Sequence, residues 1–188
     1  MIVTLPNFLT LLRILAVPFF AMAVWDGRME QACLLFAGAG LTDLLDGYLA
    51  RRFNQKSALG AILDPAADKL LMTTAFILMA FPREAVSIRI PAWVAILAIS
   101  RDLVISLVTL IAYDRWDHSK FVPSYLGKFT TMFELLAISM GLLFNTIGPY
   151  GWYRFIMPWA FYVMAGLVVA SSVHYFYRMT TGPEARTS

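Results

Sequence analysis

Hydrophobic residues occur along this chain in long runs, and polar residues and turn formers cluster in the short intervals between them. Each run approaches or exceeds the length of about 20 residues that a helix needs to cross a bilayer. Six runs can be drawn, over residues 8–25, 31–51, 58–81, 90–113, 125–145 and 153–177. The pattern therefore predicts an all-α polytopic membrane protein with six transmembrane helices.

Composition agrees with this pattern and excludes other classes of protein. Apolar residues make up 60% of the 188 residues, charged residues only 14%, and the mean hydropathy is +0.68. A chain of this size cannot bury so much apolar surface in water, and it is too apolar to be disordered. No linker or repeat divides the sequence, so residues 1–188 read as one integral-membrane domain. The single cysteine, Cys33, excludes an intrachain disulfide.

The placement of lysine and arginine predicts the orientation. Eight basic residues lie at one set of run ends and four at the other. The more basic side faces the cytosol by the positive-inside rule, which puts both termini there. The start of the chain has no cleavable signal pattern. We therefore expect a multi-pass protein of the bacterial cytoplasmic membrane, with no nucleic acid among its partners.

Acidic residues inside the apolar runs are the strongest functional signal. A carboxylate within the membrane is costly and is retained for a purpose. Six occur here: Asp43, Asp46, Asp64, Asp68, Asp102 and Glu134. Most fall in the cytosolic halves of their predicted helices. We therefore expect a water-accessible cavity that opens to the cytosol.

Four of these acids have helical spacing. Asp43 and Asp46 are three residues apart, and Asp64 and Asp68 are four apart, so each pair lies on one helix face. The stretch from residue 52 to 59 can reverse the chain and bring the two faces together as antiparallel neighbours. Four adjacent carboxylates need protonation or cations, and oxygen ligands select hard ions such as Mg²⁺, Mn²⁺ or Ca²⁺. Two such ions beside Arg51 suit phosphoryl displacement.

The full string from Asp43 to Asp68 reads D-x2-D-G-x2-A-R-x8-G-x3-D-x3-D. In all eight fixed positions it resembles the signature of the CDP-alcohol phosphatidyltransferase family. The resemblance implies a six-helix membrane fold, usually in a homodimer. It also implies that an alcohol attacks the β-phosphorus of a CDP-alcohol, such as CDP-diacylglycerol, and releases CMP.

The resemblance also implies roles for particular residues. The four aspartates Asp43, Asp46, Asp64 and Asp68 would bind two divalent cations, Mg²⁺ or Mn²⁺, and Asp68 would be the general base. The residues implied for the CDP pocket are Asn7, Thr10, Asp43, Gly47, Ala50, Arg51, Ser57 and Gly60.

The signature does not name the acceptor alcohol. The segment 7–13 resembles the opening of the phosphatidylglycerophosphate and cardiolipin synthase branch, and Arg101-Asp102 looks most like the CMP-forming cardiolipin synthases. We therefore expect phosphatidylglycerol as acceptor, with glycerol 3-phosphate as the alternative. Because glycerol 3-phosphate is a dianion, its binding would require more arginine or lysine side chains than the binding of phosphatidylglycerol. The candidate acceptor-binding residues are Arg13, Lys69, Arg101 and Lys128.

Two readings compete with the enzyme. Intramembrane acids also mark ion pathways, so a divalent-cation transporter is the alternative from another class. A scaffold whose charges only lock the helices together is the other. Arg101 and Asp102 are as consistent with a structural role as with substrate binding. Arg13 could instead snorkel to lipid headgroups, and Lys128 could simply be a positive-inside residue.

Overall fold

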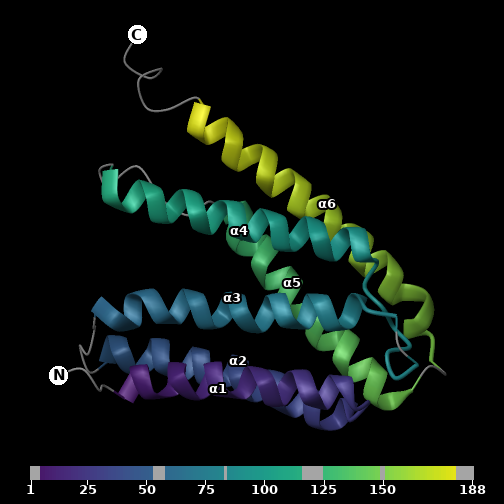
Figure 1. The fold of residues 1–188 in the computed structure, drawn as a ribbon. Coiled ribbons are helices and arrows are strands. Elements are labelled where there is room, and N and C mark those ends of the chain that lie inside the picture. Colours follow the sequence, from purple (N-terminus) through teal and green to yellow (C-terminus); the bar gives the residue numbers. More distant parts are fainter. Residues whose placement is uncertain (1–4, 53–57, 83, 116–124, 149–150, 181–188) are drawn as a thin grey trace.

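The fold was determined as a computed structural model that describes residues 5–52, 58–82, 84–115, 125–148 and 151–180. The described residues form six α-helices, and successive helices run in alternating directions (Figure 1). The helices are α1 (Leu5–Trp25), α2 (Met29–Arg52), α3 (Ala58–Ala80), α4 (Ala92–Arg115), α5 (Tyr125–Ile147) and α6 (Tyr153–Thr180). The all-α prediction is confirmed, and each helix ends within one turn of its predicted limit.

Three of the described helices, α1, α5 and α6, are long and apolar enough by themselves to be candidate membrane spans. Helices α2, α3 and α4 are of similar length, at 24, 23 and 24 residues. They also carry most of the charged residues of interest, which lower their hydropathy. Six crossings and cytosolic termini therefore remain predictions.

The turn between α1 and α2 depends on glycine. Gly27 has a φ of 75°, which is the left-handed conformation common just after a helix. The next amide, that of Arg28, donates to the carbonyl of Ala23 at 2.8 Å and closes the end of α1. A Cβ at Gly27 would also lie 3.1 Å from the Cβ of Ala85. The tight turn brings α2 back along α1.

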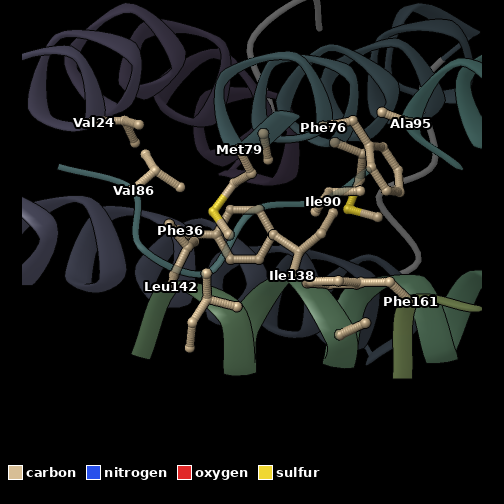
Figure 2. Packing of buried hydrophobic residues seen from close by; sticks show 14 of the residues in the cluster. Val24, Phe36, Phe76, Met79, Val86, Ile90, Ala95, Ile138, Leu142 and Phe161 are labelled. Carbon is tan, nitrogen blue, oxygen red and sulfur yellow. The ribbon is translucent and has the colours of Figure 1, made fainter. Parts of the chain in front are cut away.

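The apolar core lies between the helices and has contributions from all six. Phe20 of α1 and Phe36 of α2 meet with ring centroids 5.7 Å apart. Figure 2 shows Met79 of α3 and Ile138 of α5 in the same buried cluster as Phe36, and Phe161 of α6 also belongs to it. Outside this core, large apolar side chains on every helix remain exposed. Such a surface suits lipid rather than water.

Helix α1 positions the functional site. It packs along both α2 and α3, whereas α4 packs on α3 and α6, and α5 packs on α2, α3 and α6. Side chains on one face of α1 are therefore buried against the two helices that carry the signature aspartates.

Candidate active site

The buried face of α1 changes in character along its length. Asn7, Thr10 and Arg13 are buried at its beginning, and Phe20 and Val24 are buried further along the same helix. The spacing of three and four residues keeps all of them on one face. The first part of this face is polar because it meets the acidic positions of α2 and α3.

Arg13 connects two of the signature aspartates. Its Nη1 atom lies 3.0 Å from Oδ1 of Asp43 on α2 and 2.7 Å from Oδ1 of Asp68 on α3. Since one nitrogen touches both carboxylates, the acidic faces do converge as predicted, but a buried arginine lies between them. The sequence analysis placed Arg13 with the acceptor and did not anticipate this contact.

A third aspartate joins the same group. Asp64 lies one turn before Asp68 on α3, and its Oδ1 accepts a hydrogen bond of 2.5 Å from the Thr10 hydroxyl. Thr10 was a candidate for the CDP pocket, and the structure puts it beside this proposed metal ligand. Three aspartates of the signature thus meet the polar face of α1.

The side chains of Asp43 and Asp68 differ from that of Arg13 in their exposure to solvent. The side chains of Asp43 and Asp68 are 41% and 47% exposed, whereas that of Arg13 is 1% exposed. The carboxylates therefore line an accessible surface, and the guanidinium lies behind them as a fixed counter-charge. An approaching ligand would reach the acids first.

The donor chemistry of this group fits a hard divalent cation. Carboxylate oxygens of Asp43, Asp64 and Asp68 converge around the polar face of α1, and such oxygens are preferred by Mg²⁺ and Mn²⁺. Among the described residues, however, no three acids, histidines or cysteines are grouped closely enough to form a metal site. Arg13 supplies the compensating charge in this arrangement.

Several candidate positions lie outside what the structure describes. Ser57 falls between two described segments. The side chains of the remaining signature positions are also outside the described set, although their backbone is helical: Asp46, Gly47, Ala50, Arg51 and Gly60. Their predicted roles at the metal ions and in the CDP pocket remain predictions.

The first charged cluster is the group formed by Thr10, Arg13, Asp43, Asp64 and Asp68. A second charged cluster adjoins it through α3. Lys69 directly follows Asp68, and its Nζ forms an ion pair with Oδ2 of Asp102 on α4. The other carboxylate oxygen of Asp102 accepts a hydrogen bond of 2.7 Å from Nη1 of Arg101. One carboxylate therefore joins two of the candidate acceptor residues.

Arg101 of α4 is held by contacts with two other helices, α5 and α6. Its Nη2 donates to the Ser171 hydroxyl of α6 at 2.9 Å and to the Gly127 carbonyl of α5 at 3.3 Å. Its Nη1 also donates to the Thr131 hydroxyl at 3.3 Å. Thr131 and Ser171 were not candidates in the sequence analysis. The available signal was that small polar residues occur inside apolar helices.

Glu134 of α5 completes the second cluster. It is fully buried and interacts electrostatically with Asp102, Arg101 and Lys69. Neither of its carboxylate oxygens has a hydrogen-bond partner among the described residues. The second cluster thus contains two basic residues, Lys69 and Arg101, and two acidic residues, Asp102 and Glu134.

Lys128, the fourth candidate for the acceptor, is exposed near the beginning of α5.

Comparison with known proteins identifies the class to which this fold and these aspartates belong. The family model of CDP-alcohol phosphatidyltransferase matches residues 3–170. The chain belongs to this family, and it is an enzyme of phospholipid biosynthesis in a membrane. The resemblance noted in the aspartate signature is confirmed.

Individual relatives carry more specific names. A protein of Haemophilus influenzae, CDP-diacylglycerol--glycerol-3-phosphate 3-phosphatidyltransferase, is 38% identical over 75% of this chain and 76% of its own length. A protein of the same name from Escherichia coli is 32% identical over 91% and 92%. A cardiolipin synthase (CMP-forming) / mitochondrial hydrolase fusion protein of Schizosaccharomyces pombe is 34% identical over 93% of this chain and 31% of its own length.

Proposed function

We propose that this enzyme transfers the phosphatidyl group of CDP-diacylglycerol to a hydroxyl of glycerol 3-phosphate and releases CMP. The similarity to the Haemophilus influenzae protein carries this proposal, because that relative is named for this reaction and the match covers three-quarters of both chains. The Escherichia coli relative supports it over nearly the whole length.

This acceptor was the alternative in the sequence analysis, which favoured phosphatidylglycerol. The Schizosaccharomyces pombe relative keeps phosphatidylglycerol as the second candidate, with cardiolipin and CMP as products. The transporter alternative loses its support, because the family to which the chain belongs consists of transferases.

The chemistry that we propose is an in-line displacement at phosphorus. The acceptor oxygen attacks the β-phosphorus, the bond from this phosphorus to the bridging oxygen breaks, and CMP leaves with the bonding electrons. Asp68 accepts the proton of the attacking hydroxyl, and its partly exposed carboxylate is accessible for this role. Arg13, which holds Oδ1 of Asp68, keeps that carboxylate in a defined place.

We also propose that the enzyme binds two divalent cations, Mg²⁺ or Mn²⁺. Asp43, Asp46, Asp64 and Asp68 would hold them, and the bound ions would supply charge neutralisation for the diphosphate. Because the acids are the more exposed side of the first cluster, their oxygens face an incoming cation while Arg13 stays buried.

Substrate binding divides between the two clusters. The CDP group would lie over the signature residues of α2 and α3, near Asn7 and Thr10. The acceptor phosphate would lie toward Lys69, which directly follows Asp68, and toward Lys128 on α5. We further propose that the enzyme is a homodimer in the bacterial cytoplasmic membrane, with this site facing the cytosol.

Release of CMP with separate acceptors tests the proposed function. The purified protein in detergent micelles with CDP-diacylglycerol should release CMP when glycerol 3-phosphate is added, and should do so less with phosphatidylglycerol. Chelation by EDTA should stop the release and Mg²⁺ or Mn²⁺ should restore it. Turnover with phosphatidylglycerol but not with glycerol 3-phosphate would show that the proposed acceptor is wrong, whereas the proposed displacement at phosphorus would stand. No CMP with either acceptor would overturn the proposal.

A further inference from the structure

Asp102 occupies a central place in the second cluster, and the proposed reaction gives it no role. Its two carboxylate oxygens contact different cations from different helices, Lys69 of α3 and Arg101 of α4. A carboxylate with both oxygens in charge-assisted contacts is strongly oriented, because loss of either contact is costly inside an apolar bundle.

We propose that Asp102 is a positioning residue, which holds the Lys69 ammonium where an anionic acceptor binds, and that Arg101 acts through Asp102 rather than on the substrate. The inference rests on the proposed function, because it needs an anionic acceptor next to Asp68. It does not depend on which of the two acceptors is used, since both carry a phosphate group.

Exposure along the chain of contacts supports this division of roles. The Lys69 side chain is 35% exposed, whereas those of Asp102 and Arg101 are 8% and 5% exposed. A substrate that approaches from the open side therefore reaches Lys69 first. The ammonium has three donors, so it can contact Asp102 and still offer donors to a phosphate oxygen.

Arg101 is already committed to the protein. Its Nη1 and Nη2 atoms donate to Asp102, to Thr131 and the Gly127 carbonyl on α5, and to Ser171 on α6. These contacts make Arg101 an anchor that ties α4 to its neighbours. Asp102, fixed by Arg101, in turn fixes the ammonium group of Lys69 on α3, the residue that directly follows the proposed base Asp68.

Positioning matters here because a free lysine is a flexible cation. Its long side chain loses conformational entropy when it binds a ligand. A partner residue that already holds the side chain in place reduces this entropy loss on binding. Replacing Asp102 by Asn removes the charge and turns amide protons toward one of the two cations. Lys69 would then no longer be held toward the acceptor.

The test is a double-mutant cycle that measures KM for each substrate separately. Asp102→Asn should raise the acceptor KM about tenfold or more, as expected when a charged hydrogen bond is lost, and leave the KM of CDP-diacylglycerol unchanged. Lys69→Gln should raise the acceptor KM to a similar extent. Adding Asp102→Asn to Lys69→Gln should raise it no further, because Asp102 then has nothing to position.

The controls separate positioning from folding. Asp26→Asn makes the same chemical change in an exposed pair with Arg28 in the turn between α1 and α2, and it should leave both KM values unchanged. Asp102→Glu keeps the charge and should retain most of the acceptor affinity. If Asp102→Asn does not fold, an acceptor KM close to wild type in Asp102→Glu supports the proposal, and a tenfold rise overturns it.

Other outcomes overturn the inference without touching the proposed function. Additive effects of Asp102→Asn and Lys69→Gln on the acceptor KM would show that the two residues act independently. A lower kcat with both KM values unchanged would show a purely structural role. A wild-type protein that releases no CMP with either acceptor would instead overturn the proposed function on which the inference rests.

Discussion

Arg13 shows how much a single side chain can do in an apolar environment. It is buried in α1, yet it neutralises part of the charge of two aspartates that lie on two other helices. A buried ion pair is costly to break because one partner is then left uncompensated. In this protein the penalty is reduced, since the acids are partly exposed and screened by solvent.

Arg13→Gln should therefore lower the melting temperature, and the loss should depend on divalent cations. In EDTA, the carboxylates of Asp43 and Asp68 lose the guanidinium charge that lies beside both of them, so we expect the free energy of unfolding to fall by about 1–3 kcal/mol. This corresponds to roughly 2–4 °C for each kcal/mol in a protein of this size. With Mg²⁺ present the loss should be smaller, because bound ions stabilise the folded state.

Thermal unfolding in detergent micelles with and without Mg²⁺ measures this effect. Arg28→Gln is the matched control, since Arg28 pairs with Asp26 at 2.6 Å in an exposed turn before α2, whereas Asp43 lies in the second half of that helix. Its melting temperature should respond to Mg²⁺ as the wild type does. An equal loss for Arg13→Gln in EDTA and in Mg²⁺ would contradict a cation site at these aspartates.

At the scale of elements, close helix contacts hold α5 against its neighbours. Gly141 of α5 is buried, and a Cβ there would lie 2.9 Å from Cε of Met79 on α3 and 3.7 Å from Cζ of Phe161 on α6. The missing side chain lets α5 approach both helices. This packing also sets the position of Thr131 and Glu134, which lie earlier on the same helix beside Arg101.

Gly141→Leu should destabilise the bundle by about 1–3 kcal/mol, because an oversized side chain in a packed core forces the helices apart. Gly141→Ala should have little effect, since the contact is with the flexible end of Met79. Gly166→Leu on α6 is the control, as a Cβ there has no atom within 4 Å. Equal melting temperatures for the two leucine variants would contradict this account of α5.

At the scale of the whole molecule, the number of membrane crossings decides where the site faces. Three of the described helices qualify as spans by length and hydropathy alone, and the other three carry most of the charged residues of the two clusters. If all six cross, both termini lie on the same side. If only α1, α5 and α6 cross, the termini lie on opposite sides.

Cysteine labelling distinguishes these two cases. The only cysteine is Cys33, so Cys33→Ala gives a background without thiols. In that background, Thr4→Cys and Arg186→Cys should both resist a membrane-impermeant maleimide in intact spheroplasts and react after lysis. The reason is the excess of basic residues at the predicted cytosolic ends. Labelling of one terminus but not the other in intact cells would contradict six crossings.

Much of this protein follows from its sequence alone. Six mainly apolar runs of about 20 residues, separated by turn formers, predicted the positions of the six helices that the structure contains. The spacing of Asp64 and Asp68 determined that these two acids share one face of α3, and the family followed from the same signature. The sequence could not show that Arg13 lies between them, since that depends on how α1 packs against two other helices.

The second cluster was decided only by tertiary structure. Adjacent positions on a helix face different directions, so the sequence did not predict that Arg101 and Asp102 contact each other, and it left their other partners open. Lys69, Thr131 and Ser171 reach them from three other helices. Buried charges find partners wherever the packing supplies them, and contacts between helices carry no signature in a linear pattern. The role proposed for Asp102 therefore rests on the packing of the bundle.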